Sequence, residues 1–338
     1  MKFKSLAPAL LIFAAGFGSS LLMNQFLSSN TTLSGTQPIR DDNEYQYVNP
    51  LLLCGISEQV ESNDFDYLKN TVEQDLAAQT ESSDVVSVYF RELDTGEWFS
   101  INPEETFSPA SLLKLPLFIA YMKMAESQPS ILTTEVTINE TDWNETQNFP
   151  PKNPTIPGKK YTVTELLFAM LNDSDNNATY ALNTILDENF KNEIYTDLGL
   201  DLPSNSSTEQ FMTAKNYSHF FRVLYNASYL NHANSEQSLA LMTQSNFSEG
   251  LASGMPDSVA IAEKFGERKI ENSQGEVVLY ELHDCGIVYA TSKPYLLCVM
   301  SKSPVSFEHL STLIQTVSRA VYNEMASPRA GDFSAVKS

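Results

Sequence analysis

Strand-like segments gather near the two ends of the chain, and a long stretch without them lies between. The early pair, residues 85–90 and 97–101, is rich in β-branched and aromatic residues. An Asp-Thr-Gly turn joins the two runs, which predicts a hairpin. The late strand-like segments are 259–265, 277–282, 286–290 and 295–300. This distribution favours one antiparallel sheet to which both ends of the chain contribute.

Helical spacing occurs outside these strand groups and in the stretch between them. Residues 64–79 and 307–325 repeat apolar side chains at helical intervals, so terminal helices are expected to flank the sheet. The middle stretch holds further helical segments at 107–126, 162–171, 178–186, 188–198 and 214–225. The sequence therefore predicts an α+β fold in which the antiparallel sheet and its two terminal helices are interrupted by an all-helical insertion over about 104–250. One domain is expected over 46–328.

Residues 1–27 have the composition of a targeting segment. Two lysines precede an uncharged, largely apolar run over 5–27, which is long enough to remain as an anchor in the cytoplasmic membrane. A cleaved secretory signal is the alternative, because small residues lie inside the run. Either interpretation places the rest of the chain outside the cytoplasm, in the periplasm or at the cell surface. Residues 28–45 are expected to form a flexible tether and residues 329–338 a disordered tail.

The chain of 338 residues is strongly acidic, with 42 Asp and Glu residues, 21 Lys and Arg residues and a formal net charge of -21. Such a surface repels phosphate backbones, so nucleic acid is not expected as a partner. The four histidines show no metal-ligand spacing, and neither a metal nor another cofactor is expected. A monomer is expected. Cys285 and Cys298 flank a predicted turn at nearly opposite positions, where either a disulfide or two buried thiols would fit.

Ser111 and Lys114 form a Ser-x-x-Lys pattern at the start of a predicted apolar helix. Ser108 and Pro109 suit the N-cap and the first helical position, which puts Ser111 in the first turn. A hydroxyl there lies at the positive end of the helix dipole, and Lys114 on the same face can reach it. The pair predicts a serine nucleophile with a lysine base. The pattern alone is weak evidence, since residues 334–337 repeat it.

The second motif, Ser174-Asp175-Asn176, follows a predicted helix. As a turn sequence it would have only a structural role. As part of a site, Ser174 would relay a proton to the leaving group and Asn176 would bind a substrate amide. Asp175 would fix the loop through hydrogen bonds to the backbone.

The third motif, Lys264-Phe265-Gly266, ends a strand-like segment. Lys264 would attract a substrate carboxylate or polarise the second hydroxyl. Gly266 lets the backbone approach a ligand closely. The next residue, Glu267, would supply a backbone N–H to an oxyanion hole, together with the N–H of Ser111.

In this order the three motifs resemble those of the class A β-lactamases and their relatives among the penicillin-recognising serine enzymes. The resemblance extends from about residue 64 to the end of the last predicted helix and implies a β-lactamase/transpeptidase-like fold. It implies catalytic roles for Ser111, Lys114, Ser174 and Lys264. It implies substrate-binding positions at Asn176, Phe265, Gly266 and Glu267.

Two departures from the family pattern concern substrate recognition and turnover. Phe265 stands where the family carries a hydroxyl residue that helps to bind the substrate carboxylate. No Glu-x-x-Leu-Asn sequence, which would hold a deacylating water, follows Gly199, and Glu209 is the only glutamate in the stretch 200–210.

The resulting prediction is an exported serine hydrolase that is acylated on Ser111. Its partner would be a small-molecule β-lactam or a peptidoglycan-derived amide or ester, and turnover of β-lactams would be slow. A D,D-carboxypeptidase-like enzyme or an esterase is one alternative. A non-catalytic protein that binds cell-envelope ligands is another, although such a protein would not need all the catalytic residues together.

Overall fold

The computed structural model describes residues 45–49, 61–139, 143–200, 209–290 and 293–327, and the backbone alone of 39–40 and 51–53. The predicted anchor, the tail and most of the predicted tether lie outside these residues. Within the described part of the chain, no helix is both long and apolar enough to cross a membrane.

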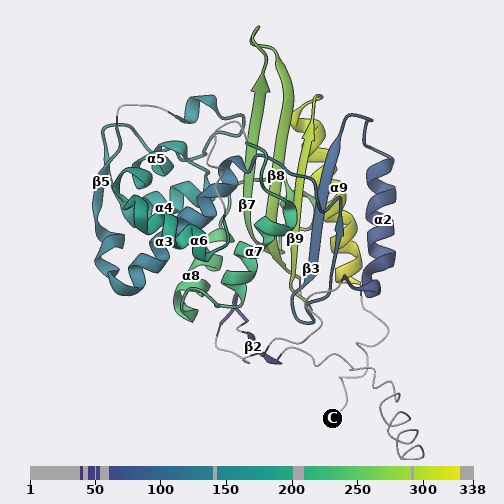
Figure 1. Cartoon of the computed structure of the whole chain (residues 1–338), viewed down its shortest axis with the longest axis horizontal. Helices are drawn as coiled ribbons and strands as arrows, with labels where there is room; N and C mark the ends of the chain where they lie inside the picture. The colour runs from purple at the N-terminus through teal and green to yellow at the C-terminus, as the bar shows by residue number, and fades with distance from the viewer. Residues whose placement is uncertain are drawn as a thin grey trace, which may run out of the picture.

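A five-stranded antiparallel sheet forms the centre of the fold (Figure 1). Its strands, in spatial order, are β4 (Trp98–Ile101), β3 (Val85–Glu92), β9 (Tyr295–Ser303), β8 (Val277–Tyr289) and β7 (Ala260–Glu271). The early strand β3 pairs with the late strand β9 along its whole length. Both ends of the chain therefore contribute to one sheet, as predicted, and the predicted hairpin is β3–β4.

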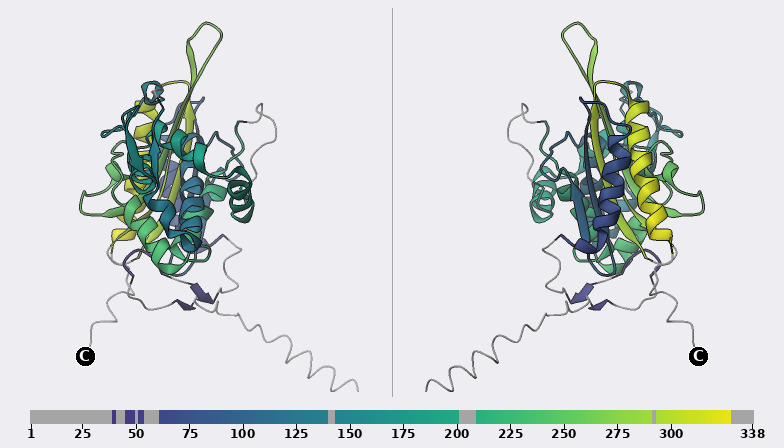
Figure 2. Two further views of the ribbon diagram at one scale, coloured as in Figure 1. Left: turned by 90° about the vertical axis from the view of Figure 1, so that its left-hand side faces the viewer. Right: turned by 90° about the vertical axis from the view of Figure 1, so that its right-hand side faces the viewer.

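Helices cover the sheet on both faces. On one face α2 (Asp66–Ala77) and α9 (Phe307–Ala326) lie side by side (Figures 1 and 2). The remaining helices form the helical body on the other side: α3 (Lys114–Ser127), α4 (Val163–Asn172), α5 (Asn176–Ile185), α6 (Glu188–Asp197), α7 (Ala214–Tyr225) and α8 (His232–Met242). Each face of the sheet has its own buried apolar cluster. The predicted α+β fold is confirmed.

Short elements complete the described chain. Two small antiparallel pairs are β1 (Ile39–Arg40) with β2 (Leu51–Leu53) and β5 (Glu135–Thr137) with β6 (Lys160–Thr162). The 3-10 turns are η2 (Asn63–Phe65), η3 (Ala110–Leu113), η4 (Pro129–Thr133), η5 (Asn144–Thr146) and η6 (Leu251–Gly254).

The start of α4 shows how a local signal fixes an element. The hydroxyl of Thr162 accepts the backbone N–H of Glu165, and the Glu165 carboxylate accepts the N–H of Thr162, at 3.2 and 2.7 Å. This is a capping box, which satisfies two donors that a helix start leaves unpaired. The register of the β8–β9 pair likewise confirms that Cys285 and Cys298 lie opposite each other, and in the structure they form a disulfide.

Several elements differ from the prediction. Strand β7 extends to Glu271, whereas the predicted segment ended at 265, so the third motif lies within the strand and not at its end. Strand β8 is continuous over 13 residues, whereas the sequence suggested two segments separated at 283–285. His283 and Asp284 caused that error, because polar residues are rarely fully buried in a central strand. Helix α8 was not predicted, since two of its four buried positions are Ser235 and Ser238, which give no apolar periodicity.

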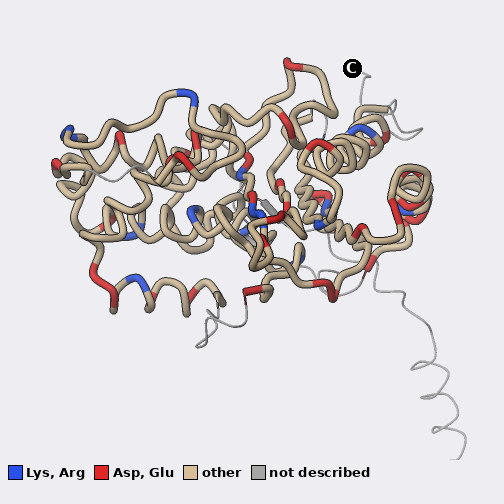
Figure 3. The backbone as a smooth tube through the Cα atoms, turned by 90° about the horizontal axis from the view of Figure 1, so that it is seen from above, with Lys and Arg blue, Asp and Glu red and all other residues tan. Residues whose placement is uncertain are grey.

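Acidic residues are spread over the sheet and the helical body alike, as the red positions of Figure 3 show. Most of them lie at the surface, where charge costs little. Asp175, Glu263 and Asp284 are exceptions, since each is at most 3% exposed. Buried carboxyl groups need partners, and all three lie beside the predicted motifs.

Candidate active site

Ser111 lies in the tight turn η3, directly before α3. The helix therefore begins at Lys114, later than predicted. The preceding residue, Ala110, has a φ of 46°, a left-handed conformation that costs energy for a residue with a Cβ. Ser108 does not cap the helix, contrary to expectation; its hydroxyl accepts a hydrogen bond from Arg268 at 3.0 Å. The turn formed by residues 108–111, here called the serine turn, is thus held by the sheet.

Two residues of the sheet, Gly266 and His283, contact the backbone of the serine turn. A Cβ atom on Gly266 would lie 2.8 Å from the carbonyl oxygen of Pro109, so only glycine permits this approach of β7. On the neighbouring strand, Nε2 of His283 lies 2.9 Å from the carbonyl oxygen of Ser108. The backbone N–H of Ser301 donates to Nδ1 of the same ring, so the ring proton is on Nε2 and is donated to Ser108. Sequence patterns gave no signal for His283.

Because the neutral ring of His283 is buried, we expect the fold to lose stability in acid. Burial lowers the pKa of His283 from 6.5 to about 4, so the folded protein keeps the ring neutral while the unfolded chain takes up a proton. Stability should fall as the pH drops from 6.5 towards 4, by about 2 kcal/mol between pH 7 and 4.5. Urea unfolding at the two pH values measures this difference.

The matched variants are His283→Gln and His232→Gln. The first should remove this part of the pH dependence, because glutamine cannot take up the proton. The second removes a half-buried histidine outside the contact and should keep the dependence. An unchanged dependence in His283→Gln would show that another group causes the acid instability.

Lys114 is buried and connects the first motif to the second. Its Nζ lies 2.5 Å from the carbonyl oxygen and 3.1 Å from the hydroxyl of Ser174, and 2.8 Å from Oδ1 of Asn176. Burial lowers the pKa of Lys114 well below its ordinary value, and the charge of Lys264 lowers it further. Nearby acids act in the opposite direction without reversing the shift. This shift favours the neutral amine, which is the form that can accept a proton from a hydroxyl.

Asp175 fixes the second motif, as the sequence predicted. Its carboxylate accepts the N–H of Ala178 at 2.9 Å and thereby caps α5. It also accepts the N–H and the hydroxyl of Thr155 at 2.6 and 3.0 Å. These bonds hold Ser174 at a φ of 55° and with its side chain fully buried.

Lys264 lies on β7 and is 1% exposed. Burial lowers its pKa to about 7, although the nearby acids Asp284, Glu263 and Glu267 favour the charged form. Burial also raises the pKa of Asp284 to about 6, and together with the Asp284 charge it raises that of Glu263 well above normal. Both shifts favour the protonated forms of these two carboxyl groups, while any negative charge on them favours the ammonium form of Lys264.

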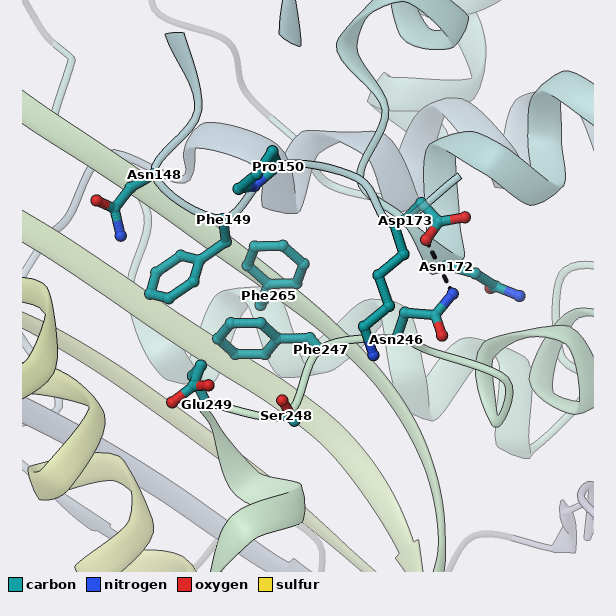
Figure 4. A pocket seen from close by; sticks show the side chains of 11 residues that line it. Asn148, Phe149, Pro150, Asn172, Asp173, Asn246, Phe247, Ser248, Glu249 and Phe265 are labelled. Atoms are coloured by element: carbon teal, nitrogen blue, oxygen red, sulfur yellow. Dashed lines mark hydrogen bonds between the residues drawn. The ribbon is translucent and has the colours of Figure 1, made fainter. Parts of the chain in front are cut away.

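The ring of Phe265 packs in an aromatic cluster formed by Phe149, Phe247 and Phe265 (Figure 4). It stacks on Phe247 with ring centres 3.9 Å apart and meets the edge of Phe149 at 6.2 Å. The cluster lines a cavity of about 200 Å³, here called the aromatic cavity. Its other lining residues are Asn148, Pro150, Lys152, Asn172, Asp173, Asn246, Ser248 and Glu249.

A second cavity of about 450 Å³, here called the serine cavity, is lined by Ala110 and Ser111 of the serine turn. Its lining residues are Ala110, Ser111, Leu113, Lys114, Leu117, Asn176, Thr179, Asn183, Lys191, Tyr195 and Glu267. Four predicted site residues thus line one cavity: Ser111, Lys114, Asn176 and Glu267. Ser174 and Lys264 are buried and do not line it, and Phe265 lines the aromatic cavity.

The carboxylate of Glu267 is a feature that the motif did not predict, since only its backbone N–H was considered. Its two oxygens accept the N–H groups of Asn148 and Phe149 at 3.0 and 2.9 Å, so it ties residues 148–149 to β7. Glu209, the only glutamate in the stretch 200–210, forms an ion pair with Arg268 and does not line the serine cavity.

The chain matches the Beta-lactamase enzyme family over residues 68–325, which is most of its length and includes all three motifs. It belongs to this family. Among solved structures, the β-lactamase family fold recurs in PBP-A, with 21% identity and a TM-score of 0.62 over 76% of this chain and 96% of PBP-A. A mutant of PBP-A is described as an acyl-enzyme complex with penicillin G.

Two β-lactamases show the same likeness. The enzyme from Sphaerobacter thermophilus DSM 20745 is 18% identical, with a TM-score of 0.63 over 77% of this chain and 99% of that one. The TLA-1 extended spectrum β-lactamase is 15% identical, with a TM-score of 0.64 over 78% and 99%. At these identities the likeness concerns the fold. No protein among those with curated descriptions matches the chain.

Proposed function

We propose that this member of the β-lactamase family is an exported serine hydrolase that acts through an acyl-enzyme on Ser111. The observation that carries the proposal is the buried amine of Lys114, whose lowered pKa and contacts with Ser174 and Asn176 fit a general base. A lysine in a purely structural role has no need of this environment, because burying an amine is unfavourable.

The reaction would proceed by acyl transfer. The hydroxyl oxygen of Ser111 would attack the substrate carbonyl carbon while its proton passes to the neutral amine of Lys114. The backbone N–H groups of Ser111 and Glu267 would stabilise the oxyanion. The proton would then pass through the hydroxyl of Ser174 to the leaving atom, whose bond to carbon breaks with its electron pair. Water would finally hydrolyse the ester on Ser111.

The proposed substrates are β-lactams or peptidoglycan-derived amides and esters, with slow turnover of the acyl-enzyme. The penicillin complex of the PBP-A mutant supports acylation by a β-lactam. Two observations support slow turnover. Phe265 packs in the aromatic cluster and has no hydroxyl to bind a substrate carboxylate. Glu209 pairs with Arg268 and does not lie in the serine cavity, where it could hold a deacylating water. Peptidoglycan lies outside the cytoplasm, which agrees with the predicted anchor over 5–27. A D,D-carboxypeptidase-like enzyme or an esterase remains the second candidate.

Intact-mass measurement tests the proposal. The protein is incubated with a fluorophosphonate and, separately, with penicillin G, and the Ser111→Ala variant serves as the control. One fluorophosphonate adduct per chain is expected, and none on Ser111→Ala. The penicillin adduct is expected to form slowly and to persist. If neither probe gives an adduct that depends on Ser111, the chain is not a serine hydrolase.

A further inference from the structure

The serine cavity extends from Ser111 to the helices α5 and α6. The side chains that line it on these two helices each carry a polar group: Asn176, Thr179, Asn183, Lys191 and Tyr195. An acyl group bound to Ser111 therefore shares one cavity with these side chains, and it can reach them without entering the aromatic cavity.

Three of these residues form a polar stripe along one face of α5. Asn176, Thr179 and Asn183 are spaced three and four positions apart, which places them on the same side of the helix. With the rise of an α-helix, the stripe is about 10 Å long. Its first residue lies beside the proposed base, since Oδ1 of Asn176 accepts a hydrogen bond from Nζ of Lys114 at 2.8 Å. The stripe thus leads from the reacting groups towards α6.

Lys191 lies at the far end of the stripe. Its Nζ is 3.4 Å from Oδ1 of Asn183 and 2.8 Å from a carboxylate oxygen of Glu188. The Glu188 side chain is 68% exposed, so water competes for this ion pair and the pair contributes little. A lysine ammonium has three N–H donors, and these two contacts with described residues leave one donor for a ligand.

The other titratable residues of the lining favour an anion beside Lys191. Burial lowers the pKa of Lys114, which favours its neutral amine. Burial raises the pKa of Glu267 and so favours its uncharged form, although its bonds with the backbone N–H groups of residues 148–149 act in the opposite direction. Burial also raises the pKa of Tyr195, so the phenol keeps its proton and can donate it in a hydrogen bond.

Tyr195 and Lys191 are four positions apart on α6, and both line the serine cavity. This spacing places the two side chains on the same face of the helix. An ammonium and a phenol on one face offer a positive charge and a second hydrogen-bond donor, a combination that suits a carboxylate.

We infer that Lys191 and Tyr195 form a subsite for a carboxylate in the acyl part of the substrate, about 10 Å from the amide that Asn176 would bind. This subsite rests on the proposed function and narrows its substrate class to acyl groups with an amide near the reacting carbonyl and a carboxylate farther along. An acyl chain as long as about three peptide residues covers the distance. Peptides carry both groups, which agrees with the peptidoglycan-derived substrates proposed above. The leaving group is not restricted.

Two p-nitrophenyl esters test the subsite. N-glutarylglycine p-nitrophenyl ester has an amide and a terminal carboxylate, and N-pentanoylglycine p-nitrophenyl ester has a methyl group in place of that carboxylate. The release of p-nitrophenol is followed by absorbance, and each kcat/KM is divided by the spontaneous rate of hydrolysis. The protein is expected to prefer the carboxylate ester by about tenfold or more. Lys191→Met, which keeps an unbranched side chain without the charge, should reduce this preference by about tenfold.

Lys123→Met is the matched control. Lys123 forms the same kind of ion pair within α3, with Glu126 three positions later at 2.9 Å, but it does not line the serine cavity. This variant should keep the preference of the parent protein.

The outcomes separate the subsite from the proposed function. Ser111-dependent hydrolysis without a preference for the carboxylate ester, or with an unchanged preference in Lys191→Met, would overturn the subsite alone. A fluorophosphonate adduct on Ser111 in a protein that hydrolyses neither ester would do the same. If neither the fluorophosphonate nor the esters react at Ser111, the proposed function fails, and the subsite fails with it.

Discussion

Replacement of Lys114 by methionine is expected to slow the acylation of Ser111 by about 10³-fold. The reason is the loss of the amine that would take the serine proton, since methionine fills a similar volume without a basic group. Because burial lowers the pKa of Lys114 well below its ordinary value, the parent protein should stay active at pH values below the ordinary pKa of a lysine and lose activity on further acidification, when the amine takes up a proton. The measurement is the rate of fluorophosphonate labelling, followed by intact mass across this pH range.

Lys123→Met is the matched control for this experiment. Lys123 lies on the same helix, α3, but its Nζ donates to the carboxylate of Glu126 and to the carbonyl oxygen of Tyr229, away from the serine cavity. Its labelling rate should equal that of the parent protein. If Lys114→Met labels as fast as Lys123→Met, Lys114 is not the base and the role must belong to another group.

Replacement of Asp175 by alanine is expected to destabilise the fold by about 3 kcal/mol. The change removes the cap of α5 and leaves the buried N–H groups of Ala178 and Thr155 without an acceptor. For a domain of this size, such a loss lowers Tm by roughly 6–12 °C, which calorimetry or thermal circular dichroism measures. Asp175 also favours the charged form of Lys114, so its loss should extend labelling of Ser111 to lower pH.

Asp187→Ala separates the capping contribution from the buried contacts. Asp187 caps α6 by accepting the N–H of Phe190 at 2.9 Å, and it is exposed. Its removal should cost about 1 kcal/mol, which is typical of the loss of an N-cap. Equal losses in the two variants would mean that the contacts of Asp175 with Thr155 contribute nothing to stability.

Local signals in the sequence were sufficient for most of the fold. The hairpin β3–β4, the capping box of α4 and the apolar face of α9 each depend on residues that are close in the chain. The sequence failed where burial of polar residues interrupts the apolar pattern, as in α8 and at 283–285 in β8. Only the packing of neighbouring strands shows that His283 and Asp284 are interior residues.

For the site, the sequence alone determined which residues are candidates, because the three motifs are short and their order along the chain can be read directly. It also showed that Phe265 departs from the family pattern. The tertiary structure decided how these residues act on one another. The lowered pKa of Lys114 depends on burial and on Lys264, which is far away in sequence.

Only the structure shows that the Phe265 ring stacks on Phe247. Likewise, only the structure shows that the Glu267 carboxylate accepts the N–H groups of Asn148 and Phe149. Caps, turns and periodicity act over a few residues, so a sequence displays them. Desolvation and charge coupling arise only when distant segments pack together, so the electrostatics of this site are a property of the folded chain.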